Sequence, residues 1–156
     1  MPATGVPPRP IPGYFVASGA FISGAAVFVA SQVSLVIMTG GDLSFWGYAI
    51  LMSIVFGVMA IFGMVVVGLV VFVIVRAGPV PRSSRRQALL VGGLCAGIGV
   101  AVVLLVQAAT GVMTFFVWSG LIGALAGGIG AARSVWNDRP ERVFPDENLL
   151  DPKPLF

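Results

Sequence analysis

Three long stretches of this chain carry no charge, because its charged residues are confined to a few positions. There are 32 uncharged residues between Arg9 and Asp42, 33 between Asp42 and Arg76, and 46 between Arg86 and Arg133. A helix that crosses a bilayer needs about 20 apolar residues at 1.5 Å each. The first two stretches therefore predict one transmembrane helix each. The third would be about 69 Å long as a single helix, so it predicts two helices joined by a turn.

The fold class that follows is an all-α membrane protein with four transmembrane helices, arranged as two hairpins with short outer loops. The predicted spans cover about residues 14–38, 45–75, 87–108 and 113–135. All eleven prolines lie outside these spans, which supports the boundaries because proline in a helix interior costs about 3 kcal/mol. Composition agrees, since 10% of the residues are charged and soluble domains carry roughly 25%.

The transmembrane domain covers residues 14–136. Three segments outside the predicted spans are rich in proline or in arginine. Residues 1–13 form a proline-rich N-terminal tail, residues 76–86 a basic loop, and residues 137–156 a proline-rich C-terminal tail. The C-terminal tail carries five acidic and three basic residues and cannot bury enough apolar surface to form a core alone. Two interpretations stay open for it, a disordered tail or an extended segment that docks on a partner.

All nine basic residues fall on one side of this predicted topology. They are Arg9, Arg76, Arg82, Arg85, Arg86, Arg133, Arg139, Arg142 and Lys153. Because cytoplasmic loops are enriched in lysine and arginine, we expect both termini to be cytoplasmic and the chain to lie in the cell inner membrane. The arginines of the basic loop set this topology and also attract anionic lipid. They explain the net charge of +3 without a nucleic-acid partner.

Small residues recur every four positions along the third and fourth predicted helices. Transmembrane helices associate through such residues, because small side chains let two backbones approach closely. The candidates for close packing are Gly93 and Gly97 of the third helix and Gly120, Gly123, Gly127 and Gly128 of the fourth. Two interpretations stay open: packing within the bundle, or docking of one stripe of the fourth helix on another subunit or on a second copy of the chain.

The sequence offers no arrangement of residues that predicts catalysis or metal binding. It has no histidine, its single cysteine, Cys95, lies in an apolar run, and no predicted span carries a charge in its interior. We therefore expect no enzyme and no catalytic, cofactor-binding or metal-binding residue. A proton-coupled transporter normally carries a carboxylate inside the membrane. Gln32 and Gln107 are the polar candidates there, and each either bonds a neighbouring helix or lines a narrow polar path.

The leading functional prediction is a small, non-catalytic, multi-pass protein of the inner membrane, an accessory, assembly or structural subunit of a larger membrane complex. Its expected partners are membrane lipids and either other membrane-protein subunits or further copies of itself. The alternative is a small oligomeric transporter, a flippase component or a pore, including a holin-like one. Short loops and glycine-rich helices fit both classes, so the sequence leaves this choice open.

Overall fold

Four α-helices make up the structure, a computed structural model that describes residues 11, 13–78, 84–111 and 114–137. They are α1 (Phe15–Met38), α2 (Trp46–Ala77), α3 (Ser84–Thr110) and α4 (Thr114–Asn137), and a short 3₁₀ turn at Leu43–Phe45 precedes α2. The all-helical expectation is confirmed. Three of these helices, α1, α2 and α3, are long and apolar enough to cross a membrane.

Many large apolar side chains point outward from the bundle, and glycines are among the residues that point inward. Phe21, Phe62 and Leu105 are each about 70% exposed, whereas Gly19 and Gly24 of α1 are buried. A helix that is apolar on all sides has no single face that must turn away from its surroundings. The inward positions are instead chosen by size, because small residues allow close contact between helices in a membrane.

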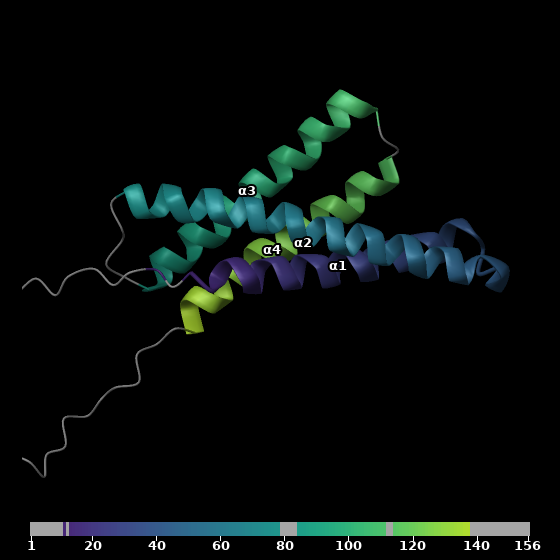
Figure 1. Cartoon of the computed structure of the whole chain (residues 1–156), viewed down its shortest axis with the longest axis horizontal. Helices are drawn as coiled ribbons and strands as arrows, with labels where there is room; N and C mark the ends of the chain where they lie inside the picture. Colours follow the sequence, from purple (N-terminus) through teal and green to yellow (C-terminus); the bar gives the residue numbers. More distant parts are fainter. Residues whose placement is uncertain (1–10, 12, 79–83, 112–113, 138–156) are drawn as a thin grey trace, which may run out of the picture.

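The helices lie in the spatial order α2, α1, α4, α3. α1 packs along α2 on one side and along α4 on the other, and α4 packs equally closely along α3. α2 meets α3 over a short stretch only and barely touches α4. Figure 1 shows the consequence: the α3–α4 hairpin diverges from the α1–α2 hairpin toward the loop that joins α3 to α4.

The two ends of the bundle differ in charge. We call one end the arginine end, because it holds the four described arginines, Arg76, Arg85, Arg86 and Arg133. The opposite end, which we call the loop end, holds the turns at Gly40–Gly41 and at Gly111 and the single described acidic residue, Asp42. Arg82 of the basic loop and most of both predicted tails lie outside the described residues.

Glycines in the left-handed region close two helices at the loop end. Gly40 and Gly41 have φ angles of 62° and 82°, and Gly111 has a φ of 63°. This backbone conformation suits glycine, which has no Cβ to clash. The N–H of Gly41 donates to the carbonyl of Val36 at 3.1 Å, and the N–H of Gly111 to the carbonyl of Gln107 at 2.9 Å. These bonds terminate α1 and α3 tightly, so the connections that follow can be short.

The apolar core sits toward the arginine end, where all four helices converge. Its buried members are Phe15, Ala20, Met64, Val67, Val71, Val75, Ala88, Val91, Cys95, Ala131 and Val135. The ring of Phe15 also lies 6.4 Å, centroid to centroid, from the ring of Phe72. Toward the loop end α3 leans away from α2, and the packed core gives way to a cavity.

Candidate functional site

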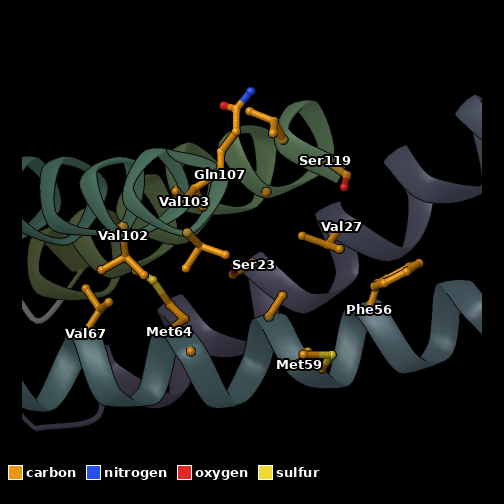
Figure 2. Close-up of a pocket in the computed structure, with 17 residues that line it drawn as sticks. Ser23, Val27, Phe56, Met59, Met64, Val67, Val102, Val103, Gln107 and Ser119 are labelled. Carbon is orange, nitrogen blue, oxygen red and sulfur yellow. The ribbon is translucent and has the colours of Figure 1, made fainter. Parts of the chain in front are cut away.

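A cavity of about 380 Å³ lies between the two helix hairpins (Figure 2). All four helices contribute to its wall. The lining residues are Ser23 and Val27 of α1; Phe56, Met59, Ala60, Gly63, Met64 and Val67 of α2; Gly99, Val102, Val103, Val106 and Gln107 of α3; and Val117, Ser119, Gly120 and Ala124 of α4. Apart from Ser23, Gln107 and Ser119, these residues are apolar or glycine.

Met64 forms the floor of the cavity, at the point where α1, α2 and α4 meet. Its side chain lies between Gly19 of α1 and Gly127 of α4, since a Cβ added to Gly127 would be 2.9 Å from the Met64 Cε. Only 5% of Met64 is exposed. Two glycines on neighbouring helices therefore create the space that this long thioether fills.

The polar lining residues lie mainly at the loop end of the cavity. Gln107 is half-buried and is three residues from the end of α3, and the buried Ser119 lies in the second turn of α4. Figure 2 shows the Gln107 amide pointing away from Met64 and Val67. The cavity thus has an apolar body and a polar rim at one end, an arrangement that the spacing of residues along the chain does not reveal.

The two small-residue stripes of α4 face two different helices of this chain. Gly128 faces α3, where an added Cβ would lie 2.7 Å from the Gly92 carbonyl oxygen, and Gly120 faces Val103 of the same helix. Gly123 and Gly127 face α1 and meet Val27 and Gly19, respectively. Of the two interpretations of the stripes, the structure therefore places those of α4 inside the bundle.

The predicted stripe of α3 lies elsewhere. Nothing lies within 4 Å of a Cβ added to Gly93 or Gly97, and both residues are exposed. Their neighbours Gly92 and Gly99 make the contacts with α4 instead, which sequence reasoning missed. The pair Gly92-Gly93 was the available signal, because adjacent glycines place a small residue on two faces of one helix.

Close contact also joins α1 to α2. Gly24 and Gly57 face each other, and a Cβ added to Gly24 would be 3.0 Å from the Gly57 carbonyl oxygen. Further along the same two helices, toward the loop end, Ser31 of α1 and Ser53 of α2 are fully buried, and neither hydroxyl has a hydrogen-bond partner among the described residues. Buried hydroxyls are normally paired, so these two are exceptions that the sequence does not signal.

Polar side chains of α1, and of Tyr14 directly before it, bond the two neighbouring helices. The Tyr14 hydroxyl donates to the Ser134 carbonyl and the Ser18 hydroxyl to the Gly130 carbonyl, each at 3.3 Å, and both acceptors belong to α4. Gln32 donates its Nε2–H to the Ala49 carbonyl of α2 at 3.4 Å. Of the two roles open to Gln32, bonding a neighbouring helix is the one that the structure shows.

The described charged groups lie at the two ends of the bundle, away from the cavity. Arg76 stands over the ring of Phe72, with its guanidinium carbon 6.0 Å from the ring centroid, a distance at which cation–π attraction operates. Arg85, Arg86 and Arg133 are exposed. At the loop end, the Ser44 N–H donates to Asp42 Oδ1 at 2.9 Å. Hydrogen bonds from the Ser44 backbone and hydroxyl lower the pKa of the Asp42 carboxyl below its usual 3.8.

No cluster of three or more histidine, cysteine, aspartate or glutamate side chains occurs within residues 11, 13–78, 84–111 and 114–137. The cavity wall consists of hydrocarbon, three polar side chains and glycine backbone. Comparison with known proteins finds no matching protein family, no matching curated protein and no matching solved structure.

Proposed function

We propose that this chain is a non-catalytic accessory or structural subunit of a larger membrane complex in the cell inner membrane. In this proposal all four helices cross the membrane and both termini are cytoplasmic. α4 has 24 residues, about 36 Å of helix, and packs along the apolar helices α1 and α3. The arginine end faces the cytoplasm, because basic residues accumulate on that side of membrane proteins.

The use of polar groups inside the bundle supports a structural role over transport. A pore or transporter for a polar solute lines its path with hydrogen-bonding or charged groups. In this bundle Tyr14, Ser18 and Gln32 bond one helix to the next, and the cavity wall is almost wholly apolar. A subunit that serves as a rigid scaffold needs this pattern, in which polarity fixes the helices and apolar surface faces outward.

Co-purification tests the proposed role. The full chain, tagged at its C-terminus and extracted in two different mild detergents, should bring the same stoichiometric set of foreign membrane subunits each time. A preparation that contains only copies of this chain would overturn the proposal. Liposomes that hold the purified chain alone should show no solute flux above that of empty liposomes, and a reproducible flux would favour the transporter class instead.

Reporter fusions test the orientation separately. A reporter enzyme that is active only outside the cytoplasm should be inactive when fused after Phe156. The same reporter inserted after Gly41, at the loop end, should be active and serves as the matched control. Activity after Phe156 would reverse the orientation, and equal activity at both positions would contradict the even number of membrane crossings.

A further inference from the structure

The cavity between the hairpins has the size and lining of a site for an apolar ligand. Its volume of about 380 Å³ falls in the range of roughly 300–1,000 Å³ that is typical of ligand pockets. Most of its wall is hydrocarbon or glycine. A polar ligand would lose its hydrogen bonds to water there without replacing them, so the lining selects a hydrocarbon chain.

The cavity is open on the side between α2 and α3, which meet each other over a short stretch only. Met59 of α2 is 65% exposed, and Val102 and Val106 of α3 are 49% and 48% exposed, although all three line the cavity. In a chain that spans the membrane as proposed, this side faces lipid. A lipid tail therefore reaches the cavity sideways without passing through water.

The cavity is about as long as half of a bilayer's hydrocarbon core. Along α2 its lining runs from Phe56 to Val67, a rise of about 16 Å at 1.5 Å per residue. Half of a typical hydrocarbon core is about 15 Å. On α3 and α4 the lining reaches to within three residues of the loop end, at Gln107 and Val117, whereas on α2 it covers the middle of the helix. The upper edge of the cavity therefore lies nearest the membrane surface along α3 and α4.

The polar rim lies where the head of such a lipid would be. Gln107 and Ser119 mark the loop end of the cavity, while Met64 and Val67 mark its deep end. The Gln107 amide carries two N–H donors, which suit the ester carbonyl oxygens that join an acyl chain to a headgroup. The cavity therefore runs from polar to apolar in the same direction as a lipid in that leaflet.

We propose that the cavity binds one acyl chain of a phospholipid from the leaflet at the loop end. The chain end then lies beside Met64 and Val67, and the ester lies beside Gln107.

Photolabelling with synthetic phospholipids tests this proposal on the full chain in nanodiscs. One probe carries a diazirine near the end of an acyl chain, and a second carries it next to the ester carbonyl. Mass spectrometry of the labelled peptides should place the first label on Met64 and Val67 and the second near Gln107, each several-fold above the labelling of outward residues such as Phe62. The reverse order of depth would mean binding from the opposite leaflet and would overturn the proposal.

Filling the cavity provides the control. Gly63 lines the cavity, and nothing lies within 4 Å of a Cβ added there, so Gly63→Leu should occupy the space and reduce labelling of Met64 and Val67 at least several-fold. Gly97→Leu is the matched variant, because Gly97 is also a helical glycine without close neighbours but lies outside the cavity. Its labelling should equal that of the wild type.

A second variant that fills the cavity, Ala60→Leu, provides the same test if Gly63→Leu does not fold. Circular dichroism checks the helix content of each variant. Unchanged labelling of Met64 and Val67 in a folded filling variant would overturn the proposal, and so would labelling spread evenly over inward and outward faces. The measurement uses the purified chain without partner subunits, so its failure is distinct from a failure of co-purification.

Discussion

Met64 and Gly127 fit together across the junction of α1, α2 and α4. A Cβ on Gly127 would lie 2.9 Å from the Met64 Cε, 3.0 Å from its sulfur and 3.1 Å from the Gly19 carbonyl oxygen. Two of these neighbours belong to a flexible side chain that can move, but the third is backbone. This junction therefore depends on the absence of a side chain at one position of α4.

A larger residue at this junction should destabilise the bundle. Gly127→Val is expected to lower the free energy of unfolding by about 1–3 kcal/mol, the usual cost of overpacking, because α1 and α4 must separate. Thermal unfolding in detergent, followed by circular dichroism, measures the change. Gly97→Val is the control, since Gly97 has open space around it. Equal melting temperatures for the two variants would contradict the close contact.

Neighbouring glycines on α3 should respond in opposite directions. A Cβ on Gly92 would lie 2.6 Å from the Ala132 Cβ and 2.8 Å from the Gly128 carbonyl oxygen, whereas Gly93 has nothing within 4 Å. Gly92→Ala should lower the free energy of unfolding by about 1–3 kcal/mol. Gly93→Ala should raise it by up to about 1 kcal/mol, because alanine is the better helix former. Equal effects in the same unfolding assay would show that α3 is rotated relative to α4.

Removing a buried hydroxyl that has no hydrogen-bond partner should stabilise the protein. Ser31→Ala and Ser53→Ala each delete a buried group without a partner, so each should raise the free energy of unfolding by about 1 kcal/mol. Ser18→Ala is the comparison, because it deletes a hydroxyl that donates to the Gly130 carbonyl. The free energy of unfolding of Ser18→Ala should fall by about 0.6 kcal/mol, an average value for hydrogen bonds between transmembrane helices. A loss of stability in both buried-serine variants would mean that a bound water or another group pairs with them.

The carboxyl of Asp42 should titrate below its usual range. Its pKa is lowered from 3.8, first by the backbone bond from Ser44 and then by the Ser44 hydroxyl. A depressed pKa means that the turn is stabilised above pH 3.8 and that this stabilisation is lost as the pH falls through the lower folded-state value. In an NMR titration of the carboxyl carbon, Ser44→Ala should raise the pKa part of the way, because the N–H donor remains. An Asp42 pKa at or above 3.8 in the unsubstituted chain would contradict the turn geometry.

The positions of the helices could be predicted from the sequence, because charge and proline mark where a span has to end. The predicted spans 14–38 and 45–75 compare with α1 at Phe15–Met38 and α2 at Trp46–Ala77. The first turn of α3 is the largest difference: the helix starts at Ser84 rather than at residue 87. The sequence predicts Arg85 and Arg86 to lie in the loop, but a helix can extend beyond its apolar segment when its end lies outside the hydrocarbon.

The order of the helices in space and the presence of the cavity could not be predicted from the sequence. Apolar helices have no polar face that fixes their rotation, so the sequence does not say whether Gly92 or Gly93 turns toward α4. Successive residues on a helix differ in direction by about 100°, and both rows of α3 contain glycine. The choice depends on how Ala96, Ala124 and Ala132 interlock with the glycines opposite them, which is a property of the assembled bundle.

Convergence at the arginine end and divergence at the loop end give the bundle the outline of a wedge (Figure 1). In a bilayer crossed as proposed, such a wedge takes up more area in one leaflet than in the other. Lipids on the narrow side must then spread further than lipids on the wide side, because both leaflets cover the same total area. A membrane crowded with copies of this chain in one orientation would therefore relieve that difference by curving so that the wide side is convex and the arginine-bearing side is concave.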